Sequence, residues 1–115
     1  MQMAKWIVLP LALLGLAYLF FKGGNVVAGA EARRLVEAGA LLVDVRTTEE
    51  FAVGHIAGAL NIPVQGLEKR MRELDPKDRP IVLYCRSGNR SARALRLLQE
   101  AGFSHVYDLG AQSRW

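Results

Sequence analysis

PIVLYCRSGNRSARALRLLQEAG, residues 80–102, is the stretch of sequence that decides the fold. Residues 80–84 form an uninterrupted apolar run, which is typical of a strand buried on both faces. Residues 90–101 then carry small and apolar side chains at helical spacing, and Gly102 ends this helix: Ala94, Leu95, Leu98 and Ala101 are expected to face inward. A buried strand that runs directly into a helix is the repeating unit of a parallel sheet.

The same alternation of strands and helices extends on both sides of this stretch. Strands are expected at residues 26–27, 41–45, 60–62 and 105–107. Helices are expected at residues 30–38, from a cap at Thr47 towards Val53, and at residues 64–74. The pattern predicts an α/β domain over residues 25–115, with a small, mainly parallel sheet and helices on both faces.

The chain has one cysteine, and it stands at the end of the central strand, where open α/β sheets carry their sites. Gly88 and Asn89 tolerate left-handed backbone angles, so the loop after Cys85 can turn its N–H groups inward as an anion nest. The following helix N-terminus and the positive charges of Arg86 and Arg90 favour the thiolate as well. We therefore expect Cys85 to be a nucleophile of low pKa. The alternative is a buried, inert cysteine followed by a solvated basic turn.

Composition excludes several classes of protein. A single cysteine allows no internal disulfide and no cysteine-cluster zinc site, and two distant histidines, His55 and His105, argue against a metal enzyme. We expect no metal and no cofactor. The formal charge is +4 over 115 residues, and Lys5 and Lys22 supply part of it, so the domain itself is not basic enough to suggest nucleic acid as a partner.

An apolar segment, WIVLPLALLGLAYLFF, occupies residues 6–21 between two lysines. As a helix it would span about 24 Å, somewhat less than a hydrocarbon core of about 30 Å, but its flanking lysines and aromatic residues suit the interfaces. We expect residues 1–24 to form a single transmembrane anchor and a short linker. The cations at Lys22, Arg33 and Arg34 place the domain on the cytoplasmic side of the cell membrane.

Two other interpretations of this segment remain open. It could be a signal peptide cut near residues 28–30, which would put the mature domain in the periplasm or outside the cell. It could also be a buried core helix, although every face of it is apolar and the domain offers little core to cover it.

Cys85-Arg86-Ser87-Gly88-Asn89-Arg90-Ser91 resembles the active-site loop of single-domain rhodaneses, which are sulfurtransferases. Two further segments resemble the signatures of that family. The first comprises Asp44-Val45-Arg46, Glu50-Phe51 and the stretch from Gly54 to Pro63, and the second is the closing segment from Gly102 to Trp115. The chain departs from the usual Gly-Gly of the closing segment at Gly110-Ala111. The resemblance covers essentially all of residues 26–115 and implies a rhodanese-like fold.

The resemblance implies a double displacement through a persulfide on Cys85. A small anionic donor such as thiosulfate gives its outer sulfur to the thiolate, and a thiol, or cyanide in an assay, then takes it. The loop would bind the donor and the persulfide through residues 86–91, namely Arg86, Ser87, Gly88, Asn89, Arg90 and Ser91.

Two rival functions follow from the same residues. A non-catalytic binding module could display the fold at the membrane, although inactive members of the family typically lack the cysteine. A phosphatase or an arsenate-reductase-like enzyme also uses a cysteine in an anion cradle, but phosphatases need C-x5-R. This chain has C-x4-R from Cys85 to Arg90, with Ser91 at the position of the phosphatase arginine.

Other polar residues are expected to be structural. Asp44 and Arg46 form a charge pair at the end of a strand, which Glu49 or Glu50 would complete. His55 is expected to be a hydrogen-bonded loop residue.

Overall fold

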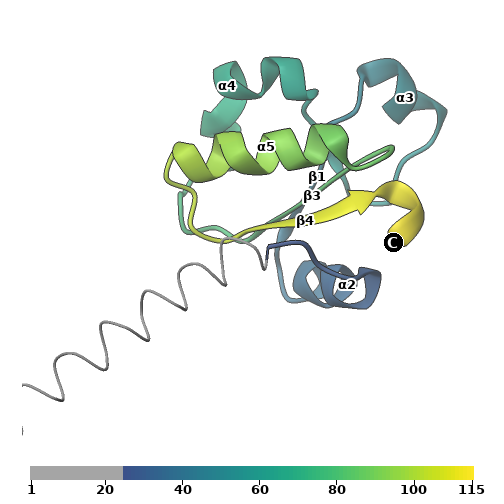
Figure 1. Cartoon of the computed structure of the whole chain (residues 1–115), viewed down its shortest axis with the longest axis horizontal. Helices are drawn as coiled ribbons and strands as arrows, with labels where there is room; N and C mark the ends of the chain where they lie inside the picture. Colours follow the sequence, from purple (N-terminus) through teal and green to yellow (C-terminus); the bar gives the residue numbers. More distant parts are fainter. Residues whose placement is uncertain (1–24) are drawn as a thin grey trace, which may run out of the picture.

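Four parallel strands form the centre of the computed structural model, which describes residues 25–115 (Figure 1). In chain order the strands are β1 (Leu41–Asp44), β2 (Leu60–Asn61), β3 (Ile81–Cys85) and β4 (Val106–Ala111). Their order across the sheet is β2-β1-β3-β4, and every neighbouring pair is parallel. The carboxyl ends of β1 and β3 therefore lie side by side, so that the residues after Asp44 lie beside the loop after Cys85.

Helices cover both faces of this sheet, as the sequence predicts. Helix α2 (Gly29–Glu37) lies on one face, and α4 (Leu67–Arg70) and α5 (Asn89–Glu100) lie on the other (Figure 1). Helix α3 (Thr48–Val53) follows β1, and a closing 3₁₀ turn, η3 (Gln112–Arg114), follows β4.

Each inner strand sends alternate side chains into two separate cores. Leu83 and Cys85 of β3 belong to the core beneath α5, together with Leu98. Val82 and Tyr84 belong to the core on the opposite face, beside α2. All five residues of β3 are buried, which confirms the interpretation of its apolar run as a strand covered on both faces.

Two predicted elements differ in the structure. The expected strand at residues 26–27 contracts to one parallel bridge between Val26 and Asp108, because α2 begins at Gly29 and leaves few residues to pair with β4. The expected helix over residues 64–74 divides into η1 (Val64–Gly66), α4 and η2 (Met71–Leu74). The backbone leaves α-helical angles at Gly66 and Arg70, with φ of −102° and −114°.

The last strand also differs from its prediction, since β4 extends to Ala111 rather than ending at Tyr107. Its register against β3 shifts between Leu83 and Tyr84, which pair with Asp108 and Gly110. Such a bulge re-aims the side chains beside it.

The predicted membrane segment, residues 6–21, and the whole of the expected anchor and linker, residues 1–24, lie outside the described residues. Among residues 25–115, no helix combines the length and the apolar character that crossing a membrane requires.

Truncation of the core beneath α5 should destabilise the domain strongly. Leu98 is fully buried, so Leu98→Ala should lower the free energy of unfolding by about 3 kcal/mol through lost burial and an unfilled cavity. Val53 is 93% exposed, and Val53→Ala should change it by less than about 0.5 kcal/mol. Urea unfolding of both variants measures the difference, and equal midpoints would contradict this account of the core.

Candidate active site

Cys85 ends β3 and is fully buried. The chain turns sharply after it, because Gly88 adopts a left-handed conformation with φ of 102°, which L side chains rarely adopt. Helix α5 begins at the next residue, Asn89. The expected left-handed geometry is therefore confirmed for Gly88, whereas Asn89 is already helical.

Two hydrogen-bonding groups contact the sulfur of Cys85. The backbone N–H of Gly88 donates to Sγ at 3.0 Å. The hydroxyl of Ser91, from the first turn of α5, lies 3.5 Å from Sγ and donates to the carbonyl of Gly88 at 3.1 Å. Ser91 is fully buried, so its hydroxyl forms hydrogen bonds with the sulfur and the loop carbonyl instead of with solvent.

Opposing effects act on the pKa of the Cys85 thiol. Burial raises this pKa, while a hydrogen bond with the Ser91 hydroxyl and hydrogen bonds from the N–H groups of Ser91, Gly88 and Ser87 lower it. The hydrogen bonds outweigh burial, and the pKa of Cys85 lies below its ordinary value. The loop thus favours the thiolate, which is the nucleophilic form of cysteine.

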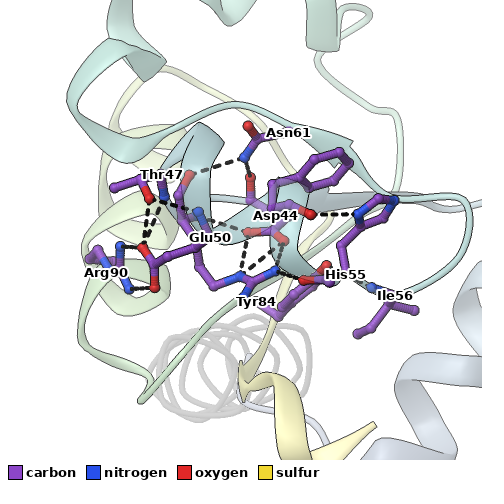
Figure 2. Close-up of polar contacts among 11 residues, drawn as sticks. Asp44, Thr47, Glu50, His55, Ile56, Asn61, Tyr84 and Arg90 are labelled. Carbon is purple, nitrogen blue, oxygen red and sulfur yellow. Dashed lines mark hydrogen bonds and ion pairs between the residues drawn. The ribbon is translucent and has the colours of Figure 1, made fainter.

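The two arginines of the loop occupy different positions. Arg86 is exposed to solvent. Arg90 instead turns its guanidinium towards α3, where it forms an ion pair with Glu50 (Figure 2). The hydrogen bonds that lower the pKa of Cys85 involve Ser91, Gly88 and Ser87, in agreement with the anion nest expected from the sequence.

A buried ion pair stands at the end of the neighbouring strand. The guanidinium of Arg46 donates to Asp44 through Nε at 3.0 Å and Nη2 at 2.7 Å, and Nη2 also donates to the carbonyl of Gly54 at 2.7 Å. The amide of Asn61 donates to the carbonyls of Asp44 and Arg46, both at 3.0 Å. The predicted charge pair is confirmed, but neither predicted third partner completes it: Glu50 pairs with Arg90, and Glu49 forms no ion pair with Arg46.

Tyr84 connects this pair to the core. Its ring lies 5.7 Å from the Arg46 guanidinium carbon, and its hydroxyl accepts the N–H of Ile56 at 3.1 Å. Burial raises the pKa of Tyr84 to about 12, so the hydroxyl stays protonated near neutral pH.

His55 has the structural role expected from the sequence. Its Nδ1 lies 2.8 Å from the carbonyl of Phe51, and its ring stacks on that of Phe51 with centroids 3.6 Å apart. Among residues 25–115, no three His, Cys, Asp or Glu side chains lie close enough together to hold a metal ion.

Sequence reasoning did not single out Asp108. Asp108 pairs with Leu83 just before the register shift, its buried carboxylate lies close to Ser91, and its Oδ1 accepts the N–H of Gly110 at 2.8 Å. Burial raises the pKa of Asp108, and the nearby Ser91 side chain and the hydrogen bond from the N–H of Gly110 oppose that rise without cancelling it. The local sequence pattern gives no signal for this residue, because its nearness to Ser91 depends on the pairing of β4 with β3.

The strand order and the buried cysteine, with the tight turn and helix start over residues 86–91, define a rhodanese-like domain. A family model described as the rhodanese-like domain matches residues 29–113, and the chain belongs to this family. It is 40% identical over 83 residues to the thiosulfate sulfurtransferase GlpE of Pseudomonas aeruginosa, covering 72% of this chain and 74% of that protein.

Further relatives and solved structures agree with this membership. A sulfurtransferase of Allochromatium vinosum is 48% identical over 69 residues, which is 60% of this chain and only 64% of that protein's length. The structure of the human single-domain sulfurtransferase TSTD1 superposes with a TM-score of 0.68 at 30% identity, covering 79% of this chain and 91% of that one.

Removal of the Ser91 hydroxyl should raise the pKa of Cys85, because it deletes one of the hydrogen bonds that lower this pKa. The rate of alkylation by iodoacetamide rises with pH as the thiolate forms, so Ser91→Ala should shift this curve to higher pH. Ser87→Ala is the matched control, because the N–H of Ser87, not its side chain, acts on the sulfur. An unchanged curve for Ser91→Ala would contradict this role.

Proposed function

We propose that this chain is a sulfurtransferase that carries sulfane sulfur as a persulfide on Cys85. The observation that carries the proposal is the N–H of Gly88, which donates to Sγ at 3.0 Å within a loop that lowers the pKa of the thiol. Membership of the rhodanese-like family and similarity to a thiosulfate sulfurtransferase support it.

The proposed reaction has two steps. The Cys85 thiolate attacks the outer sulfur of thiosulfate, a sulfur–sulfur bond forms on Cys85, and the old one breaks as sulfite leaves with its electron pair. A thiolate acceptor, or cyanide in the assay, then attacks the terminal sulfur of the persulfide and restores the Cys85 thiolate. The N–H groups of the loop would donate hydrogen bonds to the negatively charged sulfur in both the thiolate and the persulfide.

The donor that suits this loop is a small anion. Exposed Arg86 would attract it, and the N–H groups around Gly88 would receive its sulfur. The acceptor would be a thiol small or thin enough to reach Cys85, because the whole residue is buried behind its loop.

The rival functions fit the site less well. A phosphatase arginine would stand at position 91, which is a fully buried serine that contacts the sulfur. The last arginine of the loop, Arg90, has its guanidinium engaged by Glu50. A purely non-catalytic module would have no need to lower the pKa of Cys85.

Substitution of the nucleophile should abolish sulfur transfer. Cys85→Ser keeps a side chain of similar size, but a serine hydroxyl is not ionised near neutral pH and cannot form a persulfide. Thiosulfate treatment of the unmodified protein should add one sulfur atom, about 32 Da, to Cys85 and add nothing to the variant. Mass spectrometry and a thiosulfate:cyanide assay measure both effects.

The same preparations separate sulfur transfer from phosphate chemistry. The unmodified protein should show no significant hydrolysis of an aryl phosphate, because the loop lacks the bidentate phosphatase arginine. Robust aryl phosphate turnover that Cys85→Ser blocks would overturn the assignment.

We also propose that residues 6–21 anchor the domain to the cell membrane as a single span, with the domain on the cytoplasmic side. The support is the uncharged run between Lys5 and Lys22 and the cations that follow it.

The full chain should remain in the membrane fraction after high-salt and carbonate washes, whereas a chain that begins at Gly24 should stay in the supernatant and keep its activity. A mature protein beginning near Glu31 would identify a signal peptide instead. Rapid labelling of Cys85 in intact cells by a membrane-impermeant thiol reagent would contradict the cytoplasmic orientation.

A further inference from the structure

The carboxylate of Glu50 binds both terminal nitrogens of the Arg90 guanidinium. Nη1 of Arg90 donates to Oε1 at 2.6 Å, and Nη2 donates to Oε2 at 3.0 Å (Figure 2). The two residues are 40 positions apart and come from α5 and α3. A guanidinium that already holds a carboxylate in this bidentate geometry cannot clamp the oxygens of an incoming anion in the same way.

The carboxylate of Glu50 is held in place from a second side. Glu50 is the third residue of α3, and it forms a capping box with Thr47. The N–H of Thr47 donates to Oε1 at 3.1 Å, and the hydroxyl of Thr47 accepts the N–H of Glu50 at 3.1 Å. If Arg90 moved towards an anion, the Glu50 carboxylate could follow it only by breaking its hydrogen bond with the N–H of Thr47.

The pair is neutral as a whole. Hydrogen bonds from Arg90, and then from the backbone of Thr47, lower the pKa of Glu50 to about 2, so the carboxylate is charged at any ordinary pH. Its charge cancels that of Arg90 near the sulfur, and Cys85 is one of the groups that Arg90 interacts with electrostatically. Of the two loop arginines, exposed Arg86 is then the one whose charge an approaching anion meets.

We propose that Glu50 determines how strongly the active-site loop binds anions, by holding Arg90 on α3 and cancelling its charge. The inference rests on the proposed function, in which the loop receives a dianion and must release sulfite. Glu50 weakens the binding of both thiosulfate and sulfite, and the weaker binding of sulfite favours its release as the product.

Glu50→Gln tests this role cleanly. Glutamine at the third helical position still supports a capping box, so the variant removes the charge and keeps the cap. Glu73→Gln is the matched control, because Arg70 and Glu73 form another bidentate pair, at 2.7 and 2.9 Å, between α4 and η2. Both variants change the net charge of the chain equally.

The readout needs no turnover. Cys85 is the only cysteine of the chain, so iodoacetamide reports on this site alone, and sulfate is a dianion that carries no transferable sulfur. Sulfate bound at the loop should protect Cys85 from iodoacetamide. In the full chain at low salt, Glu50→Gln should lower the sulfate concentration needed for half-maximal protection by about fivefold. In about 0.5 M sodium chloride this difference from the unmodified protein should nearly disappear. Glu73→Gln should leave the sulfate concentration for half-maximal protection unchanged.

Two further variants show whether Glu50 acts through Arg90. Arg90→Gln combined with Glu50→Gln should lose the gain, because no guanidinium is left to release. Arg90→Lys should bind sulfate more tightly than the unmodified protein, by less than Glu50→Gln, since an ammonium makes no bidentate pair with Glu50.

Weaker or unchanged sulfate protection in Glu50→Gln would overturn the proposal, and so would a gain that persists without Arg90. Thiosulfate:cyanide turnover is measured on the same proteins as a separate readout. The expected protection pattern without any turnover would refute the proposed function and leave the role of Glu50 intact. Turnover with no difference in protection would do the reverse.

Discussion

The need to support a negative charge on the buried sulfur of Cys85 is the physical constraint on which the rest of this site depends. Water cannot solvate the sulfur, so the protein must supply the hydrogen-bond donors. The left-handed turn at Gly88 aims a backbone N–H at Sγ, and the first turn of α5 brings the hydroxyl of Ser91 close to it. These donors outweigh the cost of burial and keep the pKa of the thiol below its ordinary value.

Two ion pairs hold the surroundings of that sulfur, and they differ in kind. Asp44 and Arg46 are buried and bind backbone carbonyls or N–H groups nearby, so they fix the end of β1 and the loop that leads to β2. Glu50 and Arg90 are partly exposed and join α3 to the start of α5. The first pair is architectural, whereas the second includes Arg90, which interacts electrostatically with Cys85.

The strands and helices with a strong local pattern are predictable from the sequence. The apolar runs at residues 41–45 and 80–84 identify β1 and β3, because a strand buried on both faces has few polar positions. The weaker elements are not predictable in the same way. The helical spacing of residues 64–74 conceals two breaks, and the extension of β4 to Ala111 depends on its pairing with β3 across a bulge.

The sequence by itself determined the position of Cys85 at a strand end, the glycine turn after it, the length of its loop and the Thr47 cap of α3. These features are local, since each depends on residues within a few positions of one another. Only the tertiary structure decided that Glu50 pairs with Arg90 rather than Arg46, and that Asp108 lies close to Ser91. The reason is that parallel strands gather side chains from distant parts of the chain at one edge, and partners there are chosen by distance in space, which spacing along the chain does not encode.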